Sequence, residues 1–173
     1  VRLNDGGPAF YTQERVGLDG KTFTMFKFRT MRVDAEELKE SLMEANEADS
    51  SAGNSIMFKM ANDPRVTRIG AFLRKTSIDE LPQLFNVLRG DMSLVGPRPP
   101  LPSEVAQYEP RVMGKFAVRP GITGLWQISG RSNLSWDETV HLDLSYAQHR
   151  SLTLDTWIML QTIPALLRHE GAY

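Results

Sequence analysis

The chain contains no cysteine, and this absence excludes disulfide bonds, thiolate metal ligands and a cysteine nucleophile. Its 3 histidines, His141, His149 and His169, lack the spacing that is typical of zinc ligands. A bound metal ion would therefore be a hard cation held by oxygen atoms, and Mg²⁺ is the first expectation.

An excess of basic charge is also lacking, because 20 lysines and arginines stand against 21 aspartates and glutamates. Nucleic-acid-binding domains are usually basic, so we expect no nucleic-acid partner. The most hydrophobic stretch, residues 152–167, is interrupted by Asp155, Gln161 and Pro164 and is too short to span a bilayer. The 173 residues suit a single domain with its own core.

Two short strands are predicted near the N-terminus. Residues 9–16 and 21–31 are rich in β-favouring side chains, and the glycines between them favour a β-hairpin. Lys27 and Arg29 share one face of the second strand with Phe23, a mixture that suits contact with phosphate groups. The alternative is an edge strand with two solvated cations.

The most informative segment places two adjacent carboxylates, Asp79 and Glu80, after the basic pair Arg74-Lys75. An apolar repeat at helical spacing follows and ends before Gly90, so the acidic pair is predicted to lie in the first turn of a helix. The backbone N–H groups of a first turn favour an ionised carboxylate and a nearby phosphate. Such a carboxylate can act as a nucleophile or hold a divalent cation.

A purely structural interpretation of the acidic pair competes with this one. Ser77 and Glu80 have the spacing of a capping box, in which the serine caps the helix and the glutamate reaches back. The preceding helix is predicted to begin with Asp63 as N-cap and to bury Ile69 and Leu73. That helix would end with Arg74 next to the acidic pair.

Two further segments carry arginines in constrained surroundings. Arg98 lies between two prolines, which restrict its backbone and hold its guanidinium at low entropic cost, as suits a phosphate or a diphosphate. Arg119 and Arg131 bracket a glycine-containing loop that matches neither a dinucleotide fingerprint nor a Walker A sequence. An ordinary proline-rich turn and an ordinary glycine-rich turn remain the alternatives for these two segments.

Taken together, the segments resemble the bacterial sugar transferase family, the polyprenyl-phosphate phosphoglycosyl transferases. The resemblance runs from about Gly7 to Tyr173. The motifs that carry it are residues 10–17 (Phe-Tyr-Thr-Gln-Glu-Arg-Val-Gly), 27–31 (Lys-Phe-Arg-Thr-Met), 63–70 (Asp-Pro-Arg-Val-Thr-Arg-Ile-Gly), 79–93 (Asp-Glu-Leu-Pro-Gln-Leu-Phe-Asn-Val-Leu-Arg-Gly-Asp-Met-Ser), 96–99 (Gly-Pro-Arg-Pro) and 120–127 (Pro-Gly-Ile-Thr-Gly-Leu-Trp-Gln).

The resemblance implies transfer of a sugar-1-phosphate from a UDP-sugar to polyprenyl phosphate, with release of UMP. Asp79 would attack the sugar-bearing phosphorus and hold a covalent phosphosugar, which the lipid phosphate would then attack. Glu80 would help to hold Mg²⁺, together with Asp79, or would assist proton transfer. Arg98 would contact phosphate, and Arg74 and Arg131 match further basic positions near the site.

We therefore expect an α+β fold, a helix-rich single catalytic domain over 1–173 with a small N-terminal β-hairpin. The resemblance further implies association with membrane lipid at the cytoplasmic face of the bacterial inner membrane. Because the family carries a hydrophobic anchoring helix upstream of the hairpin, we expect this chain to be a fragment. A non-catalytic module that binds lipid phosphate through Lys27, Arg29 and Arg98 is the first alternative. A soluble glycosyltransferase that releases UDP is the second, and glucose and galactose remain equally open as the sugar.

Overall fold

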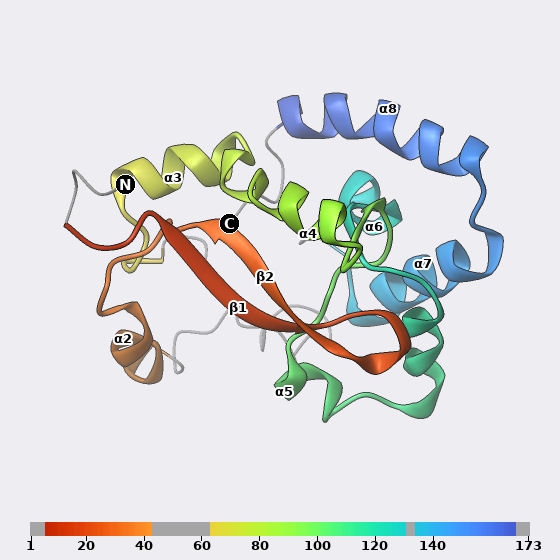
Figure 1. The fold of residues 1–173 in the computed structure, drawn as a ribbon, viewed down its shortest axis with the longest axis horizontal. Coiled ribbons are helices and arrows are strands. Elements are labelled where there is room, and N and C mark those ends of the chain that lie inside the picture. The colour runs from red at the N-terminus through yellow and green to blue at the C-terminus, as the bar shows by residue number, and fades with distance from the viewer. Residues whose placement is uncertain (1–5, 43–62, 131–133, 169–173) are drawn as a thin grey trace.

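The computed structural model describes residues 6–42, 63–130 and 134–168, which form a mixture of helices and two small sheets (Figure 1). This arrangement confirms the α+β class. The strands are β1 (Phe10–Val16), β2 (Thr22–Phe28), β3 (Ser93–Val95) and β4 (Gly121–Thr123). The helices are α2 (Ala35–Ser41), α3 (Arg68–Lys75), α4 (Gln83–Arg89), α5 (Pro102–Val105), α6 (Leu125–Ser129), α7 (Trp136–His149) and α8 (Leu152–Arg168), with 3₁₀ turns η1 (Leu18–Gly20), η3 (Ile78–Glu80) and η4 (Pro110–Ala117).

The predicted N-terminal hairpin is confirmed. Strands β1 and β2 pair antiparallel from Phe10 opposite Phe28 to Val16 opposite Thr22. The second strand ends at Phe28 and not at Met31, and Met31 instead forms an isolated bridge with Val66, ahead of α3. The end of β2 is thereby tied to the segment that leads into the acidic turn.

Helix α3 begins later than the sequence predicts, so the assignment of Asp63 as its N-cap is wrong. The Asp63 carboxylate forms a buried ion pair with Arg65 at 2.6 Å, and the side chain of Thr67 caps the helix by accepting from the Gly70 N–H at 2.9 Å. The expected burial of Ile69 is also wrong, because that side chain is exposed. Gly70 is required where α3 crosses the chain after β2: a Cβ atom there would lie 1.8 Å from the Thr30 carbonyl oxygen.

Helix α4 and its end at Gly90 are confirmed, and Gly90 has the positive φ of 81° that favours glycine. Its apolar repeat, however, does not face the interior, since Leu84, Phe85 and Leu88 are exposed. The buried contact is polar instead. The fully buried Asn86 amide accepts from Phe26 N and donates to Thr24 O, and it joins α4 to the edge of β2.

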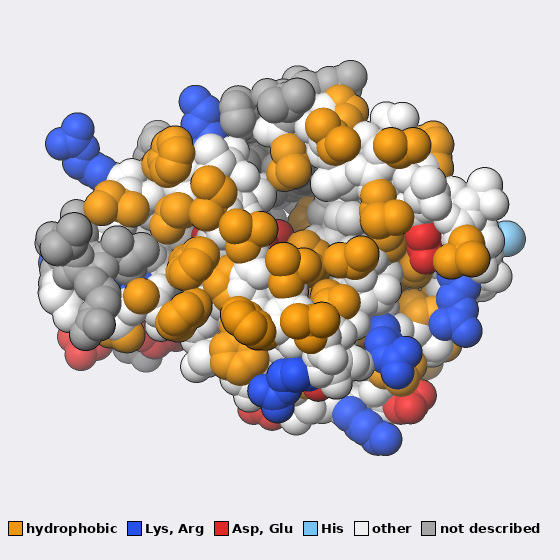
Figure 2. Space-filling model, turned by 45° about the horizontal axis from the view of Figure 1, so that its top comes forward, with side chains coloured by type: hydrophobic (Ala, Val, Ile, Leu, Met, Phe, Trp, Pro, Cys, Tyr) orange, Lys and Arg blue, Asp and Glu red, His pale blue; other side chains and the backbone are white. Residues whose placement is uncertain are grey.

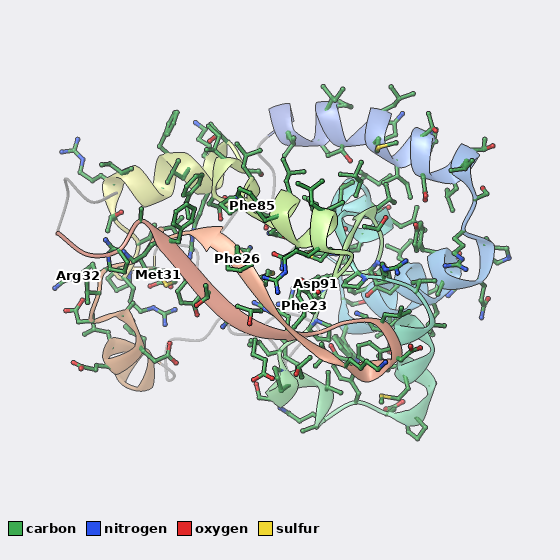
Figure 3. All side chains as sticks on the ribbon, in the orientation of Figure 1. Phe23, Phe26, Met31, Arg32, Phe85 and Asp91 are labelled. Atoms are coloured by element: carbon green, nitrogen blue, oxygen red, sulfur yellow. The ribbon has the colours of Figure 1, made fainter. Side chains whose placement is uncertain are left out.

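Figure 3 labels two groups at this junction, Phe26 on β2 and Asp91 just after α4. The Asn86 amide contacts both, because its Nδ2 atom also lies 3.2 Å from the Asp91 carboxylate. One buried side chain thus fixes the position of the hairpin relative to the helix that follows the acidic turn.

The hydrophobic core lies in the C-terminal half, where Val95, Val118, Tyr146 and Ile158 pack together. The parallel pair β3–β4, with three residues in each strand, borders this core and was not predicted. The hydrophobic stretch noted in the sequence lies in α8, which buries Ile158 and exposes several other large apolar side chains. Among the described residues, no helix has both the length and the apolar character needed to cross a bilayer.

Candidate functional site

The acidic pair lies in η3, a single 3₁₀ turn between α3 and α4. Ser77 adopts the left-handed conformation with φ 54°, and its side chain makes no capping hydrogen bond. The capping-box interpretation of Ser77 and Glu80 is therefore wrong. The tight turn leaves the Asp79 side chain only 8% exposed, while Glu80 remains partly accessible.

The hairpin supplies a cation to this turn. The Nζ atom of Lys27 on β2 donates to Oε1 of Glu80 at 2.7 Å, and both side chains keep about a third or less of their surface exposed. The contact joins residues 53 positions apart in the chain. Glu80 therefore pairs with a cation of the hairpin strand.

Asp79 experiences opposing influences on its acidity. Burial raises the pKa of its carboxyl group above the ordinary 3.8, and the neighbouring Glu80 charge raises it further, while Lys27 and Arg74 lower it. The net direction of the pKa is upward. A carboxylate with a raised pKa is a stronger base and nucleophile than an ordinary exposed one.

Arg74 approaches the same carboxylate from the end of α3. Burial lowers the pKa of its guanidinium, and the charge of Asp79 opposes that shift. Its Nε atom donates to Oγ1 of Thr30 at 3.0 Å, so the residue that follows the hairpin orients it. The structure thus brings together Asp79, Glu80, Lys27 and Arg74.

Arg98 belongs to a second group of charges. Its guanidinium makes a two-pronged contact with Glu104, Nη1 to Oε2 at 3.0 Å and Nη2 to Oε1 at 3.3 Å. Burial alone would lower the pKa of Arg98, but the Glu104 carboxylate raises it. Glu104 also accepts from the Leu101 N–H at 2.7 Å, which anchors the carboxylate to the loop after the Pro-Arg-Pro motif.

Arg29 and Arg131 have different positions. The buried guanidinium of Arg29 donates to the carbonyl oxygens of Pro8 at 2.7 Å and Met31 at 2.9 Å, so it joins the two chain segments at the end of the hairpin. These contacts give Arg29 a structural role that the sequence did not predict. Arg131 lies outside the described residues.

The residues of the acidic turn fit the expected divalent cation by their chemistry. Mg²⁺ in phosphate-transferring sites is usually held by one or two carboxylates together with substrate phosphates. Asp79 and Glu80 supply two adjacent carboxylates of that kind. Among the described residues, no group of three or more acidic, histidine or cysteine side chains forms a metal site by protein ligands alone.

Sequence reasoning assigned no role to Arg15, Thr30 or Glu104, although each contacts one of the predicted residues or its neighbour. Arg15 lies on β1 and donates to the Pro99 carbonyl at 3.1 Å, directly after Arg98. Thr30 orients Arg74, and Glu104 pairs with Arg98. Only the family motifs that contain Arg15 and Thr30 offered a signal, and that signal did not specify a contact.

Comparison with known proteins shows which protein family this chain belongs to. The family model described as bacterial sugar transferase matches residues 1–169. The chain therefore belongs to the bacterial sugar transferase family and is a transferase domain. The resemblance predicted from the motifs is confirmed.

Named relatives are similar over nearly all of this chain. The galactosyl transferase CpsE of Streptococcus agalactiae is 50% identical over 97% of this chain and 36% of its own length. The undecaprenyl-phosphate galactose phosphotransferase of Salmonella typhimurium is 47% identical over 98% of this chain and 35% of its own. The UDP-glucose:undecaprenyl-phosphate glucose-1-phosphate transferase of Xanthomonas campestris is 39% identical over 100% of this chain and 34% of its own. The chain spans about a third of the length of these relatives.

Proposed function

We propose that this domain transfers a sugar-1-phosphate from a UDP-sugar to polyprenyl phosphate and releases UMP. The observation that carries the proposal is the position of Asp79, a nearly buried carboxylate with a raised pKa beside Glu80 and between two cations. The names of the relatives, which mention undecaprenyl phosphate as acceptor and UDP-glucose as donor, support the same reaction. The products would enter lipid-linked polysaccharide synthesis.

The reaction proceeds in two displacements. An oxygen of the Asp79 carboxylate attacks the phosphorus that bears the sugar, a P–O bond forms, and the P–O bond to UMP breaks. An oxygen of the polyprenyl phosphate then attacks the same phosphorus. The acyl-phosphate bond breaks, and the Asp79 carboxylate is regenerated with the sugar phosphate on the lipid. Covalent catalysis of this kind divides one difficult displacement into two easier ones.

The surrounding cations stabilise charge on the transferred phosphate. Lys27 and Arg74 already lie close enough to Asp79 to influence its pKa, so they are placed to contact phosphate oxygens bound there. Asp79 and Glu80 would hold Mg²⁺, which when bound would neutralise diphosphate charge. Glu80 would in addition hold Lys27 in place through their ion pair.

Because polyprenyl phosphate is a membrane lipid, the domain would bind its acceptor at the membrane surface. Exposed apolar side chains cover α3, α4 and α8, which lie along one side of the molecule (Figure 1), and Figure 2 shows hydrophobic side chains gathered over that side. We name this surface the apolar face; its members are Ile69, Phe72, Leu84, Phe85, Leu88, Trp157, Leu160 and Ile163. Exposed Arg68 and Arg89 on the same helices suit anionic headgroups. We therefore place the apolar face against the bilayer, on its cytoplasmic side.

Intact-protein mass spectrometry tests the covalent step. The protein is incubated with Mg²⁺ and single UDP-sugars without lipid, beside an Asp79→Asn control. The expected result is an adduct of one sugar phosphate on the wild type alone, which disappears when polyprenyl phosphate is added. The sugar that gives the adduct identifies the donor.

Other outcomes separate the alternatives. Release of UMP without any adduct would retain the transfer reaction and refute the covalent step. Release of UDP would indicate the second alternative, a soluble glycosyltransferase. If no nucleotide is released with any UDP-sugar while polyprenyl phosphate still binds, the domain is a lipid-phosphate-binding module.

A further inference from the structure

A second group of charged side chains lies beneath the Pro-Arg-Pro loop and contains more cations than anions. Lys115 and Asp143 form a buried ion pair, and Arg98 pairs with Glu104. Arg15 is the remaining cation of the group. Among the described residues it forms no ion pair, because its guanidinium donates only to the Pro99 carbonyl and to Oε1 of Gln13.

Arg15 and Arg98 lie close together because β1 ends against the loop. The Val16 N–H donates to the Pro100 carbonyl at 2.9 Å, and Nη1 of Arg15 donates to the Pro99 carbonyl at 3.1 Å. Burial lowers the pKa of Arg15 to about 10, and the charge of Arg98 is the next largest cause. The positive charge of Arg98 thus adds to the effect of burial on Arg15, and the Glu104 carboxylate opposes both, so the surroundings of Arg15 would favour a further anion.

The Nε–H group of Arg15 is buried and has no hydrogen-bond partner within the described part of the chain. Most buried donors in proteins are paired, because an unpaired one costs about 1 to 3 kcal/mol. The arginine fork is suited to a phosphate group, which accepts two parallel hydrogen bonds. An incoming phosphate would satisfy the donor and offset the excess charge together.

The hairpin register relates this group to the acidic turn. Arg15 lies opposite Phe23, and Lys27 lies four residues further along β2 on the same face. At about 3.3 Å per residue, the two positions are separated by about 13 Å along the strand. One face of the hairpin therefore carries Lys27 beside Asp79 and Glu80 at one end and Arg15 beside Arg98 at the other.

We propose that Arg15 and Arg98 together form an anion-binding site for a phosphate group of a substrate. The inference rests on the proposed function in so far as the phosphate belongs to the sugar donor or to the lipid acceptor. Arg15 supplies the unpaired Nε–H, and Arg98, held by Glu104, supplies a second guanidinium.

The first test uses inorganic pyrophosphate without divalent cations, so that no metal bridges the ligand. Pyrophosphate should raise the thermal unfolding temperature of the wild type. Arg15→Gln should weaken the apparent affinity about tenfold or more, because a charged hydrogen-bonding fork is lost. Arg111→Gln is the matched control, since Arg111 is exposed and paired with Glu109 and Asp137 on another surface. Equal affinities in wild type and Arg15→Gln, or no binding to the wild type, would overturn the proposal.

A second measurement keeps the proposal testable if Arg15→Gln does not fold. In ¹⁵N-arginine-labelled wild type, the Arg15 Nε–H signal, assigned with Arg15→Lys, should shift on titration with pyrophosphate. An unchanged Arg15 signal would contradict direct contact. Two steady-state KM values distinguish the sources of the phosphate: Arg15→Lys should raise the KM for the UDP-sugar if the donor binds here, and for polyprenyl phosphate if the acceptor does. Arg15-dependent binding of pyrophosphate in a protein that transfers no sugar phosphate would support the site and refute the proposed function.

Discussion

The Nζ atom of Lys27 lies 2.7 Å from Oε1 of Glu80 and joins the N-terminal hairpin to the turn that carries Asp79. The same lysine is the largest charge that lowers the pKa of Asp79 against the effect of burial. A single strand residue thus positions one carboxylate and controls the acidity of the other. The pKa of Asp79 therefore depends in part on a residue of the hairpin.

Replacement of Lys27 by methionine should raise the pKa of Asp79, because the opposing charge is removed. In the proposed mechanism the ionised form of Asp79 is the nucleophile. As the pH is lowered, activity should therefore be lost at a higher pH than in the wild type, and the acidic limb of the log kcat/KM profile should shift to higher pH. At neutral pH we expect kcat/KM of Lys27→Met to fall about tenfold, which corresponds to about 1.4 kcal/mol of lost transition-state stabilisation. Lys27→Arg should keep the limb near its original position. An unshifted limb in Lys27→Met would show that Lys27 does not act on Asp79.

Asp79→Asn should make the protein more stable while removing its turnover. The pKa of Asp79 is raised in the folded state, so the folded protein binds a proton more tightly than the unfolded chain does. Stability therefore falls as pH rises from the ordinary value of 3.8 through the folded-state pKa, and the cost is present in full above it. Asparagine carries no such charge. We expect a gain of about 0.5 to 2 kcal/mol in the free energy of unfolding at neutral pH.

Urea unfolding at several pH values measures this difference. The gain of Asp79→Asn over the wild type should shrink as pH falls and should vanish below the ordinary pKa of an aspartate. Glu14→Gln serves as the control, because Glu14 is exposed on β1. A gain for Asp79→Asn that is independent of pH would contradict the electrostatic explanation.

Asn86→Ala should loosen the junction between α4 and the hairpin. The substitution removes the partners of Phe26 N and Thr24 O in a fully buried position. Each of these two part-buried hydrogen bonds contributes about 0.5 to 1.5 kcal/mol, so we expect a loss of about 1 to 3 kcal/mol in the free energy of unfolding. Gln107→Ala, which removes an exposed amide from a contact with the Ser103 carbonyl, should cost less than about 0.5 kcal/mol. Similar losses in the two variants would refute the proposed role of the Asn86 amide.

The sequence predicted those parts of the fold that depend on local signals. The hairpin follows from β-favouring runs separated by glycines, and the end of α4 follows from the left-handed Gly90. The location of α3 was missed because Asp63-Pro64 is a good local helix start, whereas the Asp63–Arg65 ion pair occupies the carboxylate. The competing contact was local, but nothing in the spacing favoured it over a cap.

The candidate site shows what sequence spacing does not determine. A capping box and a left-handed turn both fit the sequence spacing of Ser77 and Glu80. The structure has the left-handed turn, and Glu80 pairs with Lys27, a cation 53 residues away. The apolar repeat of α4 likewise reports that one side of the helix is apolar but not what covers that side. Arg15 donates to Pro99 in the Pro-Arg-Pro loop, 84 positions further along the chain. Neither the local sequence around Arg15 nor that around the loop predicts this contact.

Gly70→Ala should disrupt the site without touching any charged group. The added methyl group would meet the Thr30 carbonyl oxygen, which is backbone and has little room to move. Thr30 also orients Arg74, so displacement of Thr30 should reduce activity together with stability. We expect a loss of about 1 to 3 kcal/mol in the free energy of unfolding. Gly114→Ala is the matched control, because its nearest neighbour is the flexible end of Leu144 at 3.0 Å; equal effects of the two changes would rule out the steric argument.

Leu88→Ser should weaken binding to lipid vesicles if the apolar face lies against the bilayer. Leu88 is 83% exposed on α4, and full burial of a leucine side chain is worth about 1.5 to 3 kcal/mol. Its loss should therefore lower the partition coefficient on vesicles of phosphatidylglycerol and phosphatidylcholine by about tenfold or more in a co-sedimentation assay. Val33→Ser is the matched control, since Val33 is 66% exposed but precedes α2 and lies outside the apolar face. Equal partition coefficients for the two variants would contradict a membrane contact through the apolar face. A general effect of surface hydrophobicity would then explain the binding.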